Sequence, residues 1–201
     1  MKTVDLLNFE EKEKLIDIIK NELKNKLSDE RAMHCISTME RAEEIAKDYE
    51  IDIQIVKLTA LAHDIAKEMT IDEYESYAKD NKIYISEIDK DANAILHGII
   101  GANMVKQKYG FTQEMQDAIY YHSTGRENMT LLDKIIFLAD KSEKYREGVD
   151  ADKLREVMQN EGLDKAILWD IDYYIIPRTI KKQKTIHPQS INTRNYIIKQ
   201  I

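Results

Sequence analysis

The chain has 201 residues, of which 33% are charged and 43% hydrophobic, so its length suits one large domain with a substantial core. No apolar run approaches the ~20 residues that span a bilayer, and the acidic start MKTVDLLNFEEKEKL lacks a signal core, so we expect a cytoplasmic protein without a membrane partner. A net charge of −7 disfavours nucleic-acid binding, and the single cysteine, Cys35, excludes an internal disulfide or a thiolate zinc cluster.

Cap residues and apolar spacing predict an all-α chain. The first 176 residues contain no proline and show no strong alternation of period two, which disfavours strands. The predicted helices cover, in chain order, about residues 8–26, the segment after Ser28, residues 52–68 and the segment after the Thr70–Glu73 capping box. They continue with residues 92–109 up to Gly110, the segments after Thr112, Thr130 and Asp150, and residues 163–183. In the last of these, Pro177 kinks the helix or starts a new one.

These elements predict one domain over residues 1–201, a bundle of about eight helices. An N-terminal helix, about 1–27, either belongs to the core or is added to it. A C-terminal tail, about 184–201, is expected to be irregular with a short terminal helix.

Histidines and aspartates on apolar helices are the candidate metal ligands. They are His34, the adjacent His63 and Asp64, His97, His122, and Asp140 at the end of IIFLAD. A buried aspartate without a partner costs several kcal/mol, so Asp140 needs a partner or a metal. Neighbours on a helix differ by ~100° in direction, so His63 and Asp64 can flank one metal centre, with Lys67 on the same face.

Each of these residues has an ordinary structural explanation when it is taken alone. The combination favours iron, manganese or zinc, because all the donors are nitrogen or oxygen. Six ligands exceed the need of one tetrahedral site and suit two metals that share Asp64. Two-metal sites commonly serve phosphate hydrolysis.

The order His34, His63-Asp64, Asp140 resembles the metal signature of HD-domain phosphohydrolases. His97 and His122 are typical of the di-metal branch. The run YHSTGRENMTLLDKIIFLADKSEKYR and the later IHP are similar to the YqeK-type family, the bacterial symmetrical diadenosine tetraphosphate hydrolases. The resemblance covers about residues 20–190. It implies an HD helical bundle, two iron ions (or manganese or another divalent metal), and a dinucleoside polyphosphate substrate cleaved to two ADP.

The resemblance also implies roles for matching residues. One iron would be held by His34, His63, Asp64 and Asp140, and the second by Asp64, His97 and His122. Asp64 would bridge the metals and, with Lys67, act in catalysis. Phosphate and nucleotide contacts would come from Arg31, Lys67, His122, Ser123, Arg146, Gln183, Lys184, Thr185, Ile186, His187 and Pro188. A homodimer is compatible with the family, although no motif in the sequence specifies one. The family often has proline or valine two residues after this histidine, whereas the run HGIIGA at His97 has Ile99 there. The ligand assignment is unaffected, and a difference in the local shape of the pocket is expected.

Three other functions stay open on the sequence alone. The chain could be an HD phosphohydrolase for a dNTP, a nucleoside monophosphate or a guanosine alarmone. It could be a non-catalytic nucleotide-sensing module, or a metal-free helical interaction protein.

Secondary residues have ordinary interpretations too. Arg126 either fixes a loop or binds phosphate, Cys35 is a small core residue, and His187 is not a metal ligand. The basic cluster Arg178, Lys181, Lys182 and Lys184 is typical of a solvated helix end. Trp169, Tyr173 and Tyr174 are predicted to be core residues, with adenine stacking by one of them as the alternative.

Overall fold

The computed structural model describes residues 3–146 and 149–201, and these residues form helices without any strand. The prediction of an all-α chain is therefore confirmed. The α-helices are α1 (Phe9–Lys26), α2 (Asp29–Ala46), α3 (Ile53–Ala62), α4 (Ile71–Asp80), α5 (Glu87–Asp91), α6 (Leu96–Tyr109), α7 (Gln113–Tyr121), α8 (Leu131–Ser142), α9 (Val149–Glu161), α10 (Leu163–Asp170), α11 (Ile176–Lys181) and α12 (Pro188–Ile198). In these parts of the chain, no helix combines the length and the apolar character needed to cross a membrane.

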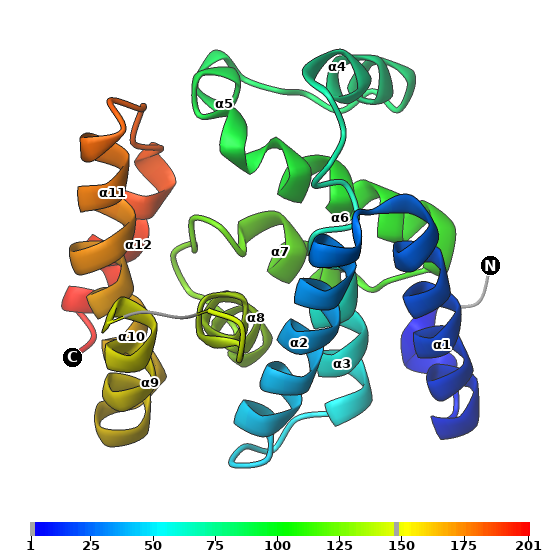
Figure 1. The fold of residues 1–201 in the computed structure, drawn as a ribbon, viewed down its shortest axis with the longest axis horizontal. Helices are drawn as coiled ribbons and strands as arrows, with labels where there is room; N and C mark the ends of the chain where they lie inside the picture. Colours follow the sequence, from blue (N-terminus) through cyan, green and yellow to red (C-terminus); the bar gives the residue numbers. More distant parts are fainter. Residues whose placement is uncertain (1–2, 147–148) are drawn as a thin grey trace.

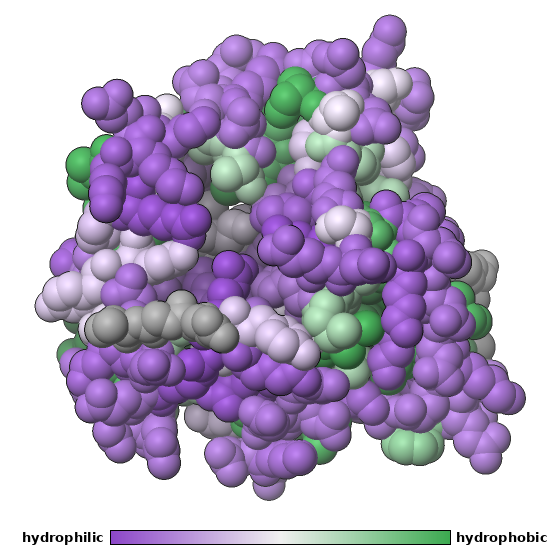
Figure 2. Space-filling model, in the orientation of Figure 1, coloured by the Kyte–Doolittle hydropathy of each residue, from purple (hydrophilic) through white to green (hydrophobic). Residues whose placement is uncertain are grey.

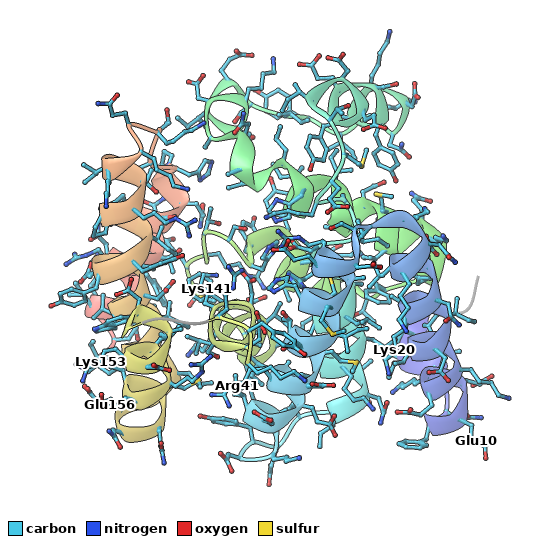
Figure 3. The ribbon with its side chains drawn as sticks, viewed as in Figure 1. Glu10, Lys20, Arg41, Lys141, Lys153 and Glu156 are labelled. Carbon is cyan, nitrogen blue, oxygen red and sulfur yellow. The ribbon has the colours of Figure 1, made fainter. Side chains whose placement is uncertain are left out.

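Helix α8 lies at the centre of the bundle. It packs against α2, α3 and α7 on one side and against α9 and α10 on the other (Figure 1). Helix α1 covers α3, while α4 packs on α6 at the top of the view. The C-terminal helices α11 and α12 stand apart from α2 on the opposite side of the molecule (Figure 1). Charged side chains such as Glu10, Lys153 and Glu156 project from the outer helices, whereas Lys141 lies on the central α8 (Figure 3).

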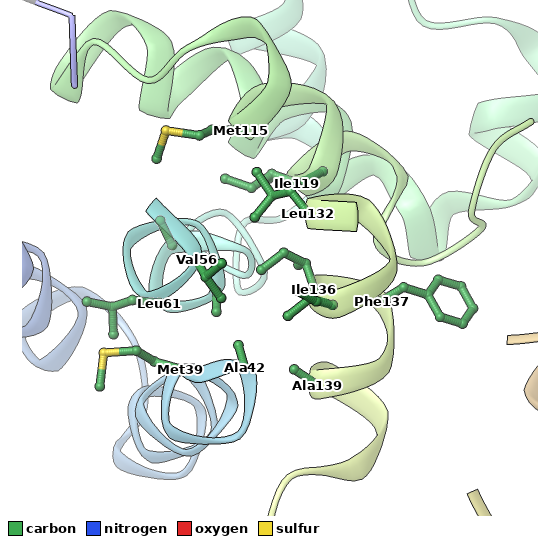
Figure 4. Close-up of a cluster of buried hydrophobic side chains, with 14 of the residues drawn as sticks. Met39, Ala42, Val56, Leu61, Met115, Ile119, Leu132, Ile136, Phe137 and Ala139 are labelled. Atoms are coloured by element: carbon green, nitrogen blue, oxygen red, sulfur yellow. The ribbon is translucent and has the colours of Figure 1, made fainter. Parts of the chain in front are cut away.

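The hydrophobic core forms where α2, α3, α7 and α8 meet (Figure 4). Ile136 of α8 points toward α3, and the next residue, Phe137, points the opposite way (Figure 4). Both side chains are completely buried. Because consecutive helix residues face different directions, α8 can be apolar over much of its circumference only when it is covered on two sides. Helix α8 is therefore the central element of the bundle, and the candidate site described below lies next to it.

Most predicted helix starts, and the predicted end of α6 at Gly110, are confirmed. The side chains of Ser28, Thr70, Thr112 and Thr130 accept hydrogen bonds from backbone N–H groups in the first turns of α2, α4, α7 and α8. Gly110 ends α6 in the left-handed conformation, with φ of 69°. A residue without Cβ adopts that conformation at little cost.

Several predicted boundaries are wrong. The predicted helix 52–68 ends at Ala62, and the chain continues through turns whose i to i+3 hydrogen bonds include Ile65 N–Ala62 O and Lys67 N–Asp64 O. Buried Ile65 and Ala66 carry the apolar pattern beyond the helix. Helix α9 begins at Val149, so Asp150 lies inside its first turn and does not cap it. Gly148, whose residue type also favours a break before this helix, lies outside the described residues.

In the C-terminal third, the alternative that Pro177 starts a new helical segment is confirmed, whereas the subdivision of the helix and the regularity of the tail differ from the prediction. Residues 163–183 divide into α10, a π-helical segment Ile171–Ile175 and α11, with Pro177 in the first turn of α11. Proline lacks the N–H that a first-turn residue does not use, so it begins α11 without disturbing it. The tail holds α12, an 11-residue helix that the prediction of an irregular tail understated. These divisions bring the number of α-helices in the described residues above the predicted eight.

Candidate metal centre and nucleotide cavity

The six predicted ligands converge in the interior from five different parts of the chain. His34 comes from α2, the His63-Asp64 pair from the turns after α3, His97 from α6, His122 from the end of α7, and Asp140 from α8. All but Asp140 are classed as buried, and the Asp140 side chain is 13% exposed. His63 and Asp64 are therefore presented by a turn rather than by the helix that the sequence predicts.

Asp64 turns its two carboxylate oxygens toward different histidines. Its Oδ2 lies 3.5 Å from His63 Nε2 and 3.8 Å from His34 Nε2. Its Oδ1 lies 3.1 Å from His97 Nε2 and 3.7 Å from His122 Nε2. One carboxylate thus faces two groups of nitrogen donors, which is the geometry that a bridging ligand needs.

Asp140 completes the first of these groups. Its Oδ1 lies 3.1 Å from His34 Nε2 and 3.7 Å from His63 Nε2. Three sets of ligand atoms lie within 4.8 Å of one another: His34, His63 and Asp64; His63, His122 and Asp140; and Asp64, His97 and His122.

The histidine rings are held so that Nε2 points inward. The Nδ1 atoms of His63 and His122 lie 2.7 and 2.6 Å from the carbonyl oxygens of Ala60 and Ile119, one helical turn earlier. A ring that donates from Nδ1 to such an acceptor presents an Nε2 lone pair to a metal.

Glu143 plays the same part for His34. Its Oε1 lies 3.3 Å from His34 Nδ1, and its Oε2 accepts hydrogen bonds from Ser37 Oγ and the Tyr145 backbone N–H. Glu143 is a candidate site residue that the sequence analysis missed. Its position three residues after Asp140, at the C-terminal end of α8, is the signal that could have found it.

The residues fit a bound metal. His34 Nε2, His63 Nε2 and Asp64 Oδ1 are buried, and although other site atoms lie 3.1 to 3.8 Å from them, none makes a hydrogen bond of acceptable geometry among the described residues. A buried polar atom without a partner costs free energy, and metal coordination would satisfy all three atoms. The nitrogen and oxygen donor set suits iron, manganese or zinc.

The protonation states also suit metal binding. Burial opposes ionisation of Asp64, but His63, His97 and Lys67 outweigh it and hold the Asp64 pKa well below its usual range. Burial likewise opposes ionisation of Asp140, yet Lys141, His34 and His63 lower its pKa. Burial lowers the pKa of His97 and, more strongly, of His122. Charged carboxylates and neutral imidazoles are the forms in which these groups bind metals.

His63 is the exception among the histidines. Burial would lower its pKa, but the charges of Asp64 and Asp140 outweigh burial and raise it. The negative charges of the two carboxylates favour a proton on His63, and a metal cation bound between them would take the place of that proton.

Close packing of α6 on α7 brings His97 to His122. A Cβ on Gly98 would lie 2.9 Å from the Tyr120 carbonyl oxygen, closer than side-chain carbons approach. Gly98 therefore allows the close contact between the two helices. The Nε2 atoms of His97 and His122 are 2.9 Å apart as a result.

Three cationic side chains reach the centre from its open side. Arg31 Nη1 donates to Asp64 Oδ2 at 2.8 Å, and Arg146 Nη2 donates to Asp140 Oδ1 at 3.1 Å. Lys67 Nζ lies 3.1 Å from His97 Nε2 and 3.6 Å from Asp64 Oδ1. Each of the three is between 29% and 39% exposed, so each can also contact a ligand from solvent.

A cavity of about 440 Å³ opens beside these cations. It lies on the face that Figure 2 shows to be mostly hydrophilic and hollowed between the C-terminal helices and α2. Predicted nucleotide residues line it: Arg31, Lys67, Ser123, Arg146, Lys184, Thr185, Ile186 and His187. Gln183 and Pro188 flank this segment in sequence but do not line the cavity, and His122 lies beneath Ser123, with Nε2 3.1 Å from its Oγ.

Six basic residues converge on this cavity although the whole chain is acidic. Arg178 and Lys182 join Arg31, Lys67, Arg146 and Lys184, and the acidic lining residue is Asp91. The basic cluster that was predicted to be a solvated helix end therefore contributes Arg178, Lys182 and Lys184 to the wall of the cavity. Such a concentration of positive charge suits a polyphosphate.

Comparison with known proteins agrees with this geometry. The model of the HD domain matches residues 31–145, from Arg31 to Tyr145, more than half of the chain.

The chain belongs to the HD-domain family.

Two bacterial relatives carry the same name, symmetrical bis(5'-nucleosyl)-tetraphosphatase. The protein from Halalkalibacterium halodurans is 34% identical over 88% of this chain and 93% of its own length. The protein from Staphylococcus aureus is 32% identical over 90% of this chain and 93% of its own length. The resemblance to an HD-domain hydrolase of this group is confirmed.

A solved structure shares the same HD fold. It is described as a predicted HD superfamily hydrolase involved in NAD metabolism from Clostridium acetobutylicum. The TM-score is 0.87 at 32% identity, covering 92% of this chain and 97% of the other.

The remaining predicted residues of this HD chain have structural roles. Arg126 pairs with Asp117 and Asp133, so it fixes its loop. His187 caps α12 and lies 3.1 Å from Asp89 Oδ1, linking the C-terminal segment to α5. Cys35 is buried as predicted. The core prediction is wrong for Tyr173, which is 66% exposed and stacks on Trp169, because its face of the π-helical segment points to solvent.

Proposed function

We propose that this protein hydrolyses diadenosine tetraphosphate symmetrically to two ADP. The observation that carries the proposal is the juxtaposition of a two-sided ligand cluster around Asp64 with a cavity walled by six basic residues. A tetraphosphate carries several negative charges, and that cavity supplies matching positive charge beside the ligand cluster. The two relatives named for this activity support the choice of substrate.

We propose two metal ions, which the family resemblance suggests are iron. His34, His63, Asp64 and Asp140 would hold one, and Asp64, His97 and His122 would hold the other. Metals bound here supply an activated water and neutralise phosphate charge.

The chain's own cations position the substrate in this proposal. Arg31 and Arg146 each bind a ligand carboxylate and face the cavity, so a phosphate group between them lies directly over the cluster. Lys67 reaches the side of Asp64 that faces His97, where it stabilises charge on a non-bridging phosphate oxygen. Ser123 and residues 184–187 contact the ADP unit of the substrate.

The test is incubation of the purified protein, loaded with iron(II) or manganese, with diadenosine tetraphosphate. Products are separated by ion exchange, and metal is quantified on the same sample. Two ADP per substrate support the proposal. AMP plus ATP would contradict symmetrical positioning, and no turnover with metal bound would favour another nucleotide or a sensing role.

A further inference from the structure

A second, smaller cavity adjoins the two site arginines. It has a volume of about 310 Å³, and Arg31 and Arg146 line both this cavity and the larger one described above. His34 and Glu143 also line it, so it reaches the metal-ligand cluster directly. The two arginines are therefore shared by two cavities, and each arginine also donates to a carboxylate of the ligand cluster.

The two cavities differ in chemistry. The larger one has six basic lining residues, whereas the smaller one has Met33 and Tyr145 in its walls and Glu30 as an additional acidic lining residue. Met33 is 47% exposed and Tyr145 is 55% exposed, so both offer apolar surface to a ligand. Glu30 and Glu143 disfavour a phosphate there, while an uncharged nucleoside is compatible with them.

Tyr145 is held in place beside the cluster. Its backbone N–H donates to Glu143 Oε2 at 2.7 Å, and the other oxygen of the same carboxylate faces His34 Nδ1. Met33 precedes His34 on α2. The positions of Met33 and Tyr145 therefore both depend on the position of one candidate metal ligand, His34.

We propose that this smaller cavity binds the second nucleoside of the dinucleotide, with its base between Met33 and Tyr145. The inference rests on the proposed function and deepens it. A symmetrical substrate has a nucleoside at each end of its phosphate chain, so the ends must lie on opposite sides of the cleavage point. Arg31 and Arg146 bind the central phosphates, the larger cavity takes one ADP unit, and the smaller cavity takes the other nucleoside.

This arrangement makes the second nucleoside a specificity determinant. A base stacks on an aromatic or apolar face whatever its hydrogen-bonding edge. Contacts with Met33 and Tyr145 therefore depend on whether a base is present and not on which base it is. Loss of one stacking partner is expected to weaken binding about tenfold.

The experiment compares two substrates on the metal-loaded enzyme. Diadenosine tetraphosphate has two nucleosides, and adenosine 5'-tetraphosphate has the same phosphate chain with one. Tyr145→Ala and Met33→Ala should each raise KM for the dinucleotide about tenfold and leave KM for adenosine 5'-tetraphosphate within about twofold. Tyr145→Phe should retain the wild-type KM for both. Tyr84→Ala is the matched control, because Tyr84 is 83% exposed and lies outside the lining of both cavities.

The outcomes separate the two proposals. An unchanged KM for the dinucleotide in both alanine variants, or an equal rise for both substrates, would overturn the inference while leaving the hydrolase intact. A wild-type enzyme that binds metal but releases no ADP from diadenosine tetraphosphate would overturn the proposed function, and the assignment of the second cavity with it.

Discussion

His97 Nε2 and His122 Nε2 lie 2.9 Å apart, 25 residues apart in sequence and on different helices. Burial lowers the pKa of both rings, so each is a neutral group whose nitrogen faces the other and Asp64 Oδ1. Two neutral nitrogens in contact can share one hydrogen bond at most, whereas a metal would engage both lone pairs. The pair therefore marks one half of the candidate metal centre.

Removing one member of this pair should remove one metal. His122→Ala is expected to lose the ion held by Asp64, His97 and His122 and to retain the ion held by His34, His63 and Asp140. Metal analysis after reconstitution checks this prediction. His187→Ala is the control, since His187 pairs with Asp89 and should leave metal content unchanged. Full metal content in His122→Ala would contradict the ligand assignment.

Asp64 should be required for both ions, because each of its oxygens faces a different pair of histidines. Asp64→Ala is expected to abolish turnover and to lose metal from both sides, measured by product analysis and metal quantification on one sample. Asp80→Ala, at an exposed position ending α4, should change neither. Retained activity in Asp64→Ala would disprove the shared-ligand arrangement.

Lys67 should affect the reaction rate more than metal binding. Its Nζ lies close to Asp64 and His97, but an ammonium group is not a metal ligand. Lys67→Ala is expected to lower kcat about 100-fold while metal content is retained, because one donor to the developing phosphate charge is lost. Lys134→Ala, which removes a surface pair with Asp164, should leave kcat unchanged. A rise in KM alone would instead assign Lys67 to ground-state binding.

Gly98 should be intolerant of a side chain. A Cβ there would meet the Tyr120 and Ile119 carbonyl oxygens at 2.9 and 3.0 Å, so Gly98→Ala would push α6 away from α7. We expect a loss of about 1–3 kcal/mol in unfolding free energy and less metal on the His97–His122 side. Urea unfolding and metal analysis measure both. Gly101→Ala is the milder comparison, because its nearest contact, Ile65 Cγ2, is at 3.4 Å; equal losses in the two variants would refute the argument.

Asp170 should make stability depend on pH. The side chain is buried beside the central α8 region, and burial raises its pKa to about 7, against about 3.9 in an unfolded chain. The folded state therefore binds the proton more tightly, and its stabilising contribution, complete below about pH 4, is lost as the pH rises through 7.

Asp170→Asn removes this dependence. The variant is expected to be more stable than the wild type at pH 8, by at most about 4 kcal/mol, with an advantage that shrinks as the pH falls to 5. Urea unfolding of metal-free protein at each pH measures the difference. Asp80→Asn, at an exposed carboxylate, should show no such trend. An advantage independent of pH would contradict a raised Asp170 pKa.

Local chemistry explains where sequence reasoning succeeded and where it failed. Ser28, Thr70, Thr112 and Thr130 cap helices through hydrogen bonds to residues three positions away, so short sequence patterns predict those starts. The end of α3 was missed because Ile65 and Ala66 remain buried after the helix stops. An apolar pattern reports burial, and a buried turn gives the same pattern as a buried helix.

The sequence by itself determined the helical class, most helix starts and the set of six candidate ligands, because these follow from composition, caps and the residue types that bind metals. Only the tertiary structure decided which oxygen of Asp64 faces which histidines, that Glu143 orients His34, and that Met33 and Tyr145 share a cavity with Arg146. These relationships join residues far apart in the sequence, such as His34 and Glu143, which are 109 positions apart. Such distances depend on how α2, α3, α6, α7 and α8 pack, and no local pattern encodes that packing.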